Sequence, residues 1–427
     1  MMTWILAGLP LLMMVLGFPI YLIFFVSALV VLLLYMNVPL EIVVQQAFGS
    51  IDQFSLMAVP FFLFAGEVMG RGGMSRRLVD WFLSIFGGIR GSLGYVTIAT
   101  CEFFGTISGS SPATVGALGK LLYPALTQNG YNHNFSIGLV TASGAVAIVI
   151  PPSIAMILYA AGSNQSVARL FIAGVVPGLF IGLCTAAYIT YHVWRYRIPA
   201  VGRFSPHRFL AATYRAGWAL GVPIVVLGGI YGGITTPTEA AGIAAIYGLL
   251  VARFFYQEIS WRGLLDVAAS SALLTAQILI IVAASGVFSW LLTVLGVPQA
   301  ITSTIRAMNL EAWLVLLVIT IFLQLVGMLL DPTSAILILT PLLFPVATAV
   351  GVDPVHFGII FTVNMAIAMF TPPFGLNIFV SQALFQLPMK SILPGLVPFQ
   401  IVNLAALLVI TYVPELSLWL PRVIYGR

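Results

Sequence analysis

The sequence predicts an all-α polytopic membrane protein built from two inverted repeats. The 427-residue chain is 61% hydrophobic and only 7% charged, with a mean hydropathy of +1.10. Such a composition excludes a soluble globule with a charged surface. Two further observations refine the prediction: two long apolar segments are interrupted at their centres by small polar residues, and the halves of the chain share an ungapped internal repeat.

Apolar stretches long enough to span a bilayer, which takes about 20 residues, follow one another along the chain. No basic region and no small-residue cleavage site precedes the first stretch, so we interpret it as a membrane segment and not as a signal peptide. It could form one helix or two, broken at Gly17-Phe18-Pro19. The expected spans are residues 3–36, 54–69, 135–160, 170–194, 216–234, 238–255, 265–293, 355–381 and 394–419.

Segments 92–128 and 311–347 are apolar at both ends but polar at their centres, where they read SGSSP (108–112) and DPTS (331–334). Each could be one long broken helix or a re-entrant hairpin. Backbone without regular hydrogen bonds is tolerated at membrane depth only where protein or a water-filled cavity covers it. The distribution of arginines distinguishes the two alternatives.

The positive-inside rule places both arginine clusters, within residues 71–90 and 195–215, in the cytoplasm. Because two spans already separate the clusters, segment 92–128 must enter and leave on one side, as a hairpin that opens to the cytoplasm. Continuing along the chain, the second hairpin opens to the outside. The clusters comprise Arg71, Arg76, Arg77 and Arg90, and Arg195, Arg197, Arg203, Arg208 and Arg215.

The two halves are also related in sequence. LLYPALTQNGYN at 121–132 aligns without gaps on LLFPVATAVGVD at 342–353, an offset of 221 residues. The same offset carries Ser110 onto Asp331 and the proline pair 151–152 onto 372–373. Inverted repeats with discontinuous helices are typical of secondary transporters, whose ion and solute sites lie near the midplane where helices break.

The proline pairs, in IVIPPSI (148–154) and MFTPPFG (369–375), supply the breaks, because proline lacks a donor and disfavours helix in the preceding residue. Freed carbonyls and hydroxyls are suitable ligands for Na⁺, a hard cation. We therefore expect two pseudo-symmetric cation sites. In the first, Ser108, Ser110, Ser111 and Thr114 face Thr141, Ser143 and the first break; in the second, Asp331, Thr333 and Ser334 face Asn364, Thr371 and the second break.

Each polar residue also has a simpler interpretation. Membrane-embedded Ser and Thr often only pack and bond a carbonyl one turn back. Asp331, an acid within an apolar run, indicates an ion or solute site, and the alternative is an N-cap for the second hairpin arm. At the first tip, glycine permits a tight turn, and the helix N-terminus that follows presents N–H groups to an anion.

Other polar residues suggest structural roles. Glu102 and Lys120 lie nine residues to either side of Ser111, which predicts an ion pair between the hairpin arms. Glu239 belongs to a helix N-terminus. Cysteines 101 and 184 sit in apolar surroundings and are expected in the core, and the four histidines show no metal spacing.

From about residue 50 onward the sequence resembles the large membrane subunit of tripartite ATP-independent periplasmic (TRAP) transporters, within the ion transporter superfamily. The motifs are AVPFFLFAGEVMGRGGMS (58–75), GTISGSSPATVGALG (105–119), IVIPPSIAMILYA (148–160), LFIAGVVPGLF (170–180), TPTEAAG (236–242) and the long run at 329–380. One departure is Thr114, where many members have an aspartate.

The resemblance implies Na⁺-coupled uptake of an organic acid across the bacterial inner membrane by an elevator mechanism, without enzymatic activity, cofactor or nucleic acid. It implies two partners, a separate four-helix membrane subunit and a periplasmic solute-binding protein. No Lys or Arg lies inside either tip or break, so helix N-termini, hydroxyls or bound Na⁺ are expected to attract the acid. The resemblance implies Na⁺ binding by Ser108, Gly109, Ser111, Ile150, Pro151, Asp331, Thr333, Ser334, Asn364, Thr371 and Pro372, to which the residue argument adds Thr141 and Ser143. The solute candidates are Ser110, Thr114, Ser153 and Asn377.

This interpretation divides the chain into scaffold and transport regions. The scaffold and arm helices are expected at 1–91 and 170–310, the transport regions at 92–169 and 311–390, and a C-terminal helix at 391–427. The main alternative function is a stand-alone ion-coupled carrier or antiporter of the same fold that needs no binding protein. An intramembrane enzyme lacks support, because the sequence has neither HExxH nor facing acid pairs. A passive scaffold subunit would not need two symmetric broken helices.

Overall fold

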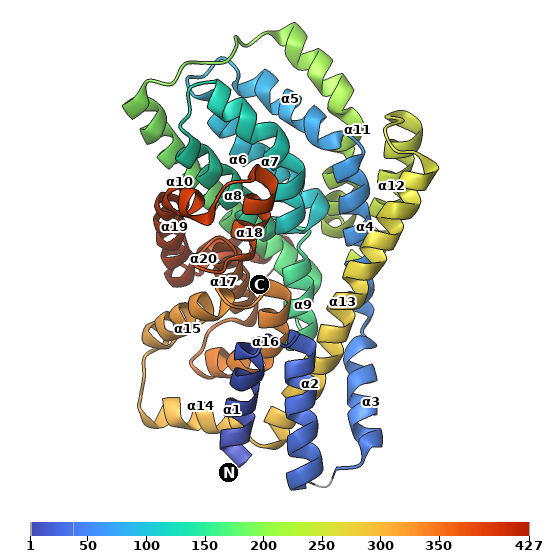
Figure 1. Ribbon diagram of the computed structural model, residues 1–427, viewed down its shortest axis with the longest axis vertical. Helices are drawn as coiled ribbons and strands as arrows, with labels where there is room; N and C mark the ends of the chain where they lie inside the picture. The colour runs from blue at the N-terminus through green and yellow to red at the C-terminus, as the bar shows by residue number, and fades with distance from the viewer. Residues whose placement is uncertain (1, 37, 427) are drawn as a thin grey trace.

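The computed structural model describes residues 2–36 and 38–426, and every regular element in these ranges is a helix (Figure 1). The all-α prediction is confirmed. The α-helices are α1 (Met2–Val15), α2 (Ile20–Val31), α3 (Leu40–Ile51), α4 (Ala58–Arg71), α5 (Met74–Phe86), α6 (Ser92–Ser108), α7 (Ser111–Gln128), α8 (His133–Val146), α9 (Ile154–Ser163), α10 (Val167–Tyr196), α11 (Pro206–Tyr231), α12 (Pro237–Leu250), α13 (Trp261–Val294), α14 (Val297–Ala307), α15 (Ala312–Gly327), α16 (Pro332–Ala349), α17 (Pro354–Ala368), α18 (Leu376–Phe385), α19 (Met389–Tyr412) and α20 (Glu415–Tyr425).

The first and last apolar segments each form two helices. Residues 3–36 are interrupted between α1 and α2, where Gly17 has a φ of +77° and Pro19 precedes α2. A left-handed glycine followed by proline cannot continue a helix, so the question left open by the sequence is settled in favour of two helices. At the other end, the expected span 394–419 is divided between α19 and α20 by Val413 and Pro414.

Both interrupted segments form helical hairpins. In the first, Gly109 and Ser110 connect α6 to α7, and Gly109 adopts a φ of +58° at the end of α6. Glycine adopts this left-handed conformation without the steric cost of a Cβ, which explains the tight turn. In the second hairpin, residues 328–331 connect α15 to α16. The central polar residues therefore form the hairpin tips.

The internal repeat also sets the helix bounds. Helices α7 (111–128) and α16 (332–349) start and end 221 residues apart, and α8 and α17 start at 133 and 354 with the same offset. The turns before α8 and α17 contain Gly130 (φ +90°) and Gly351 (φ +84°), again 221 residues apart. Both α8 and α17 end before a proline pair, after which α9 and α18 resume the helical path.

The two halves interlock through the helices that follow the breaks. Helix α9 packs against α16 in the other half, and α18 packs against α7. The contacts are close: a Cβ added at Gly162 would lie 3.3 Å from Thr340, and one at Gly119 would lie 2.5 Å from Leu384. Each hairpin is therefore held in place by the broken helix of the opposite half.

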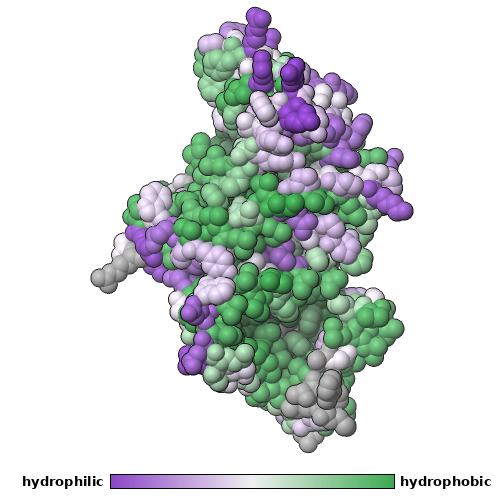
Figure 2. Space-filling model, turned by 90° about the vertical axis from the view of Figure 1, so that its left-hand side faces the viewer, coloured by the Kyte–Doolittle hydropathy of each residue, from purple (hydrophilic) through white to green (hydrophobic). Residues whose placement is uncertain are grey.

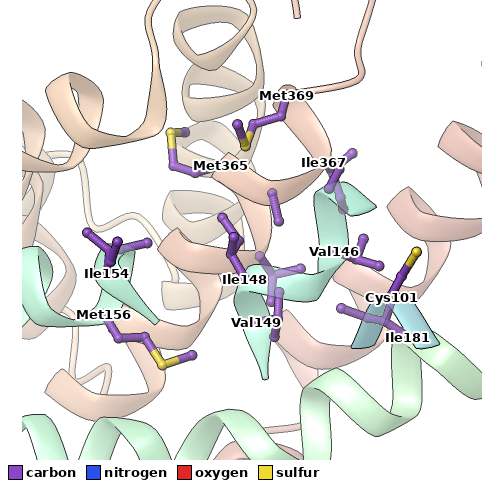
Figure 3. Close-up of a cluster of buried hydrophobic side chains, with 14 of the residues drawn as sticks. Cys101, Val146, Ile148, Val149, Ile154, Met156, Ile181, Met365, Ile367 and Met369 are labelled. Carbon is purple, nitrogen blue, oxygen red and sulfur yellow. The ribbon is translucent and has the colours of Figure 1, made fainter. Parts of the chain in front are cut away.

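The broken helices meet in the buried core. Figure 3 shows Ile148 and Val149, at the first break, near Met365 and Met369 at the end of α17, and the turn 147–149 packs against α17. Cys101 is fully buried in this cluster, as predicted, whereas Cys184 is partly buried and packs against the core from its edge.

The exterior suits a membrane. Eight helical segments in the described part of the chain are long and apolar enough to cross a bilayer by length and composition. Figure 2 shows one face that is largely hydrophobic, with hydrophilic residues gathered at its upper end. That end corresponds to the part of Figure 1 where α11 begins, beside the arginine-rich loop.

At the start of α12, Thr236 and Glu239 form a capping box, as expected for Glu239.

Candidate functional site

The first hairpin tip is a compact network of hydroxyls. Ser108 Oγ shares a 3.0 Å hydrogen bond with Thr114 Oγ1, which also donates to the Ser110 carbonyl at 2.8 Å. Ser108, Ser111 and Thr114 are at most 1% exposed. These residues meet at one tip, and the Thr114 hydroxyl bonds Ser108 and Ser110 within that tip and not Thr141 or Ser143, which the sequence prediction had it face.

The first helix break lies against this tip. An ideal Cβ at Gly109 would be 3.3 Å from the Pro152 carbonyl oxygen and 3.6 Å from the Ile154 nitrogen. Ile150 is extended ahead of Pro151, and buried Ser153 caps α9 by accepting a hydrogen bond from the Met156 amide. The Pro152 carbonyl, which the sequence argument did not single out, therefore lies directly against Gly109 of the tip turn.

On α8, the two hydroxyl residues expected at the first site behave differently. Thr141 Oγ1 shares a 2.7 Å hydrogen bond with Ser381 Oγ on α18. Ser143 Oγ is buried and has no hydrogen-bond partner within the described structure. A buried oxygen without a hydrogen-bond partner costs free energy, so the Ser143 hydroxyl is the α8 group that is free to coordinate a cation.

The second tip centres on Asp331, the N-cap of α16. Its carboxylate accepts hydrogen bonds from the Ser334 amide at 3.1 Å and from Ser334 Oγ at 2.5 Å. The N-cap alternative for Asp331 is therefore confirmed. The carboxylate remains partly exposed beside Thr333, and both residues line the central cavity described below, so capping leaves the acid accessible.

At the second break, the predicted residues bind neighbours that sequence alone did not identify. Gln324 Nε2, on α15, donates to both the carbonyl and the side-chain oxygen of Asn364, at 3.0 and 3.2 Å. Thr371 Oγ1, next to Pro372, donates to the Ile367 carbonyl and accepts from Gln400 on α19. Within the described residues no hydrogen bond joins Asp331 to Asn364 or Thr371, so the second set does not form one network.

The two tips line one cavity of about 940 Å³. The first tip contributes residues 108–113 and the second contributes residues 331–333, with walls from α4 and α13. Helices α7 and α16 begin at these tips, so both N-termini lie at the cavity and favour negative charge there. The sequence prediction places the solute between these tips, and that placement stays a prediction.

Of the four predicted solute residues, only Ser110 lines the cavity directly. Thr114, Ser153 and Asn377 are fully buried behind it. Asn377 Nδ2 donates to Ser111 Oγ at 2.6 Å, whereas Asn377 Oδ1 has no partner within the described structure. Asn377 therefore supports the first tip and does not reach the cavity.

The predicted ion pair between Glu102 and Lys120 is wrong. Glu102 is 9% exposed and faces α10, where a Cβ at Gly182 would lie 2.1 Å from its Oε1. Lys120 is exposed and lines the cavity. Equal sequence distance from the tip fixes the height of the two residues but not the helix faces on which they lie.

The cavity also contains polar residues that the sequence argument missed. Glu67 and Arg71 on α4 form a 2.6 Å ion pair, and Ser270 and Gln277 contribute from α13. Glu67, Ser270 and Gln277 lie inside predicted spans and Arg71 lies just beyond the span 54–69, all far along the chain from either tip. Glu67 and Arg71 belong to the motif at 58–75, but that motif does not indicate a place in the cavity, and only the packing of α4 and α13 against the hairpins brings these residues to the site.

Comparisons with known proteins agree with this architecture. The profile of the DctM component of tripartite ATP-independent periplasmic transporters matches residues 7–416. The C4-dicarboxylate TRAP transporter large permease protein DctM of Pseudomonas aeruginosa is 40% identical over 88% of each chain. The corresponding protein of Rhodobacter capsulatus is 36% identical over 99% of this chain and the full length of the relative.

Two further similarities are informative. The isethionate TRAP transporter permease protein DctMQ of Oleidesulfovibrio alaskensis is 39% identical over 96% of this chain, which spans 64% of that relative's length. The YdaH transporter of Alcanivorax borkumensis has the same fold, with a TM-score of 0.64 and 14% identity over 91% of this chain and 89% of the YdaH chain. The chain belongs to the DctM family of tripartite ATP-independent periplasmic transporters, and is a multi-pass permease subunit of the bacterial inner membrane, not an enzyme.

Proposed function

We propose that this permease carries an organic acid into the cell, coupled to Na⁺, with the solute held between the two hairpin tips. The observation that carries the proposal is the shared cavity, into which both tips and both following helix N-termini project. Aligned N–H groups and helix dipoles at two N-termini favour an anion between them. Relatives named for C4-dicarboxylates and isethionate support an acidic solute, and a relative named for ectoine broadens the class.

Na⁺ is proposed to bind behind each tip. At the first tip, the proposed ligands are Ser108, Gly109 and Ser111 with the Ile150-Pro151 break, since Gly109 lies against Pro152 just after that break. The buried Ser143 Oγ and Asn377 Oδ1 have no hydrogen-bond partner in the described structure and are therefore free to coordinate a cation. At the second tip, the Asp331 carboxylate supplies charge beside Ser334 and Thr333, and Asn364 and Thr371-Pro372 at the second break are the further proposed oxygen ligands. Oxygen ligands and a nearby carboxylate suit a hard monovalent cation.

Alternating access is proposed to follow an elevator mechanism. The hairpins are re-entrant, the repeats are inverted, and regions 92–169 and 311–390 move together against the scaffold. Interlocking of α9 with α16 and of α18 with α7 supports this, because it ties both hairpins into one body. A single rigid body that holds both tips can carry the solute across without separating its two binding surfaces.

Two partners complete the proposed transporter. A small membrane subunit is expected to bind the scaffold, and a periplasmic solute-binding protein is expected to deliver the acid. The DctMQ relative supports the first partner, since this chain spans only 64% of its length. A stand-alone carrier remains the competing possibility.

The test is uptake into proteoliposomes that contain this chain and the small subunit, with labelled succinate, isethionate and ectoine as probes. Each probe is measured with and without an inward Na⁺ gradient and the matching binding protein. Uptake that requires both Na⁺ and the binding protein supports the proposal. Na⁺-driven uptake without the binding protein would make the chain a conventional carrier, and equal uptake without a Na⁺ gradient would refute coupling to Na⁺.

A further inference from the structure

The charged side chains that line the central cavity differ in whether they have an ion-pair or hydrogen-bond partner. Arg71 pairs with Glu67 at 2.6 Å, and Glu67 also accepts a hydrogen bond from Ser271. Asp331 accepts two hydrogen bonds from Ser334. Lys120 is the cavity cation for which the described residues supply no carboxylate within ion-pair distance. A cation of the cavity wall is therefore left available to a mobile anion.

Helix α7 presents Lys120 on the same face as the tip. Ala113, Gly116, Ala117 and Lys120 all line the cavity, and their spacing of three and four residues places them on one side of the helix. A Cβ added at Gly116 would meet nothing within 4 Å, so the wall between the tip and Lys120 is open.

The direction of the lysine side chain favours contact with a solute at the tip. Side chains on a helix tilt toward its N-terminus, and the N-terminus of α7 is the hairpin tip. Nine residues separate Ser111 from Lys120, a rise of about 13 Å along the axis. The long lysine side chain spans part of this height. The remaining gap between its ammonium and the tip has the dimensions of a small solute and runs along a wall of alanine and glycine.

We propose that Lys120 binds the acid group of the solute that lies farther from the hairpin tips, and thereby selects dianionic over monoanionic solutes. This inference rests on the proposed function, because it assumes that the cavity holds the transported acid. One acid group is held by the helix N-termini at the tips, and the second forms a charge-assisted hydrogen bond with the lysine ammonium. Lysine acts here as a single flexible point charge and not as a bidentate fork.

A purely structural Lys120 would give a different result. If the ammonium only balanced the negative charge of Asp331 across the cavity, its removal would impair all solutes equally. If it binds the second acid group, its removal penalises dianions alone. The choice between the two roles therefore depends on solute charge and not on the size of the loss.

The first test compares apparent affinity for succinate, a dianion, with that for butyrate, a monoanion of similar length. Binding is measured on the purified complex of this chain with its small subunit. Lys120→Gln is expected to weaken succinate binding about tenfold and to change butyrate binding less than about twofold. Lys120→Arg should retain most of the succinate affinity, and Lys390→Gln, at the start of α19 and outside the cavity, serves as the matched control. Equal losses for both solutes would overturn the proposal.

A second measurement needs no transported solute, and so separates this inference from the proposed function. A Gly116→Cys probe, one turn from Lys120, is placed in a Cys101→Ala, Cys184→Ser background. Anionic and cationic methanethiosulfonates of similar size then report the local charge. Lys120→Gln should lower the anionic-to-cationic rate ratio about tenfold, whereas Lys390→Gln should not change it. An unchanged ratio in Lys120→Gln would show that the lysine does not attract anions into the cavity, even if the protein transports acids.

Discussion

Asn377 Nδ2 donates a 2.6 Å hydrogen bond to Ser111 Oγ, across 266 residues of sequence. The bond connects the helix that follows the second break with the first residue of α7, at the tip of the first hairpin. One turn later on α18, Ser381 bonds Thr141 on α8. The geometry of the first tip therefore depends on a helix from the other half of the chain, which ties the first tip to the second break.

The first prediction is energetic coupling between Ser111 and Asn377. Both side chains are buried, so removal of either partner leaves the other unsatisfied. Ser111→Ala, Asn377→Ala and the double variant should form a non-additive cycle with a coupling energy of about 1 kcal/mol. The measurement is the Na⁺ concentration for half-maximal uptake in proteoliposomes, compared across the four proteins.

The control for this cycle is Ser381→Ala paired with Ser111→Ala. Ser381 lies on the same helix as Asn377, but its hydroxyl bonds Thr141 and not Ser111. This pair should be closer to additive than the Asn377 pair. Additive losses for Ser111 and Asn377 would mean that the bond does not position the tip.

A second prediction separates the two roles of Asp331. Asparagine caps helices about as well as aspartate but carries no charge, whereas alanine does neither. Asp331→Asn should therefore retain thermal stability and lose Na⁺-driven uptake, and Asp331→Ala should in addition lose about 1 kcal/mol of stability. Detergent-solubilised protein is heated and analysed by size exclusion, and uptake is measured against Na⁺ concentration.

The opposite outcome for Asp331 is equally clear. If Asp331→Asn transports with unchanged Na⁺ dependence, the carboxylate acts only as the cap of α16. The short hydrogen bond from Ser334 would then account for its presence in an apolar run.

Much of this fold was predictable because membrane helices leave a strong signal in sequence. Apolar length marks the spans, the proline pairs mark the breaks, and the 221-residue offset that aligns Ser110 with Asp331 also aligns the N-caps of α7 and α16. Local sequence determines such features, since a cap or a break depends on neighbouring residues. The tip residues of the site could be predicted from the sequence for the same reason.

The remaining part of the site depends on contacts between distant segments. The partners of Asn364 and Thr371, Gln324 and Gln400, lie on helices α15 and α19, and neither belongs to a motif. The predicted pairing of Glu102 with Lys120 failed because height along a hairpin does not specify helix rotation. The face that a helix turns toward its neighbours is set by packing, as for Glu102 against Gly182. Because those neighbours are distant in sequence, the residues around Glu102 do not reveal the rotation of its helix.

The third prediction concerns the approach of α4 to the first tip. A Cβ at Gly66 would lie 2.6 Å from Ser108 Cα and 3.0 Å from the Ser108 carbonyl oxygen. Backbone atoms cannot move aside as a flexible side chain would, so Gly66→Ala should displace the tip from α4. We expect a loss of about 1–3 kcal/mol in stability and loss of uptake.

The matched control is Gly242→Ala, in α12, where a Cβ would meet nothing within 4 Å. Alanine has the higher helix propensity, so this variant should be as stable as the parent or slightly more stable. The two variants are compared by melting temperature and by Na⁺-driven uptake. Normal transport by a stable Gly66→Ala protein would show that α4 and the tip separate freely.

The fourth prediction tests inverted topology directly. The loop before α11 carries arginines and is expected in the cytoplasm, whereas the turn between α14 and α15 is expected outside. Val201 and Met308 are 38% and 61% exposed, so a cysteine at either position is accessible to a reagent in the adjacent solvent. In intact cells, a membrane-impermeant maleimide should label Met308→Cys and leave Val201→Cys unlabelled; in inside-out vesicles the pattern should reverse.

Both variants are made in a Cys101→Ala, Cys184→Ser background, which also serves as the unlabelled control. Labelling of both cysteines from the same side would place the two hairpins in parallel orientation, and the elevator arrangement, which needs one hairpin opening to each side, would fall with it.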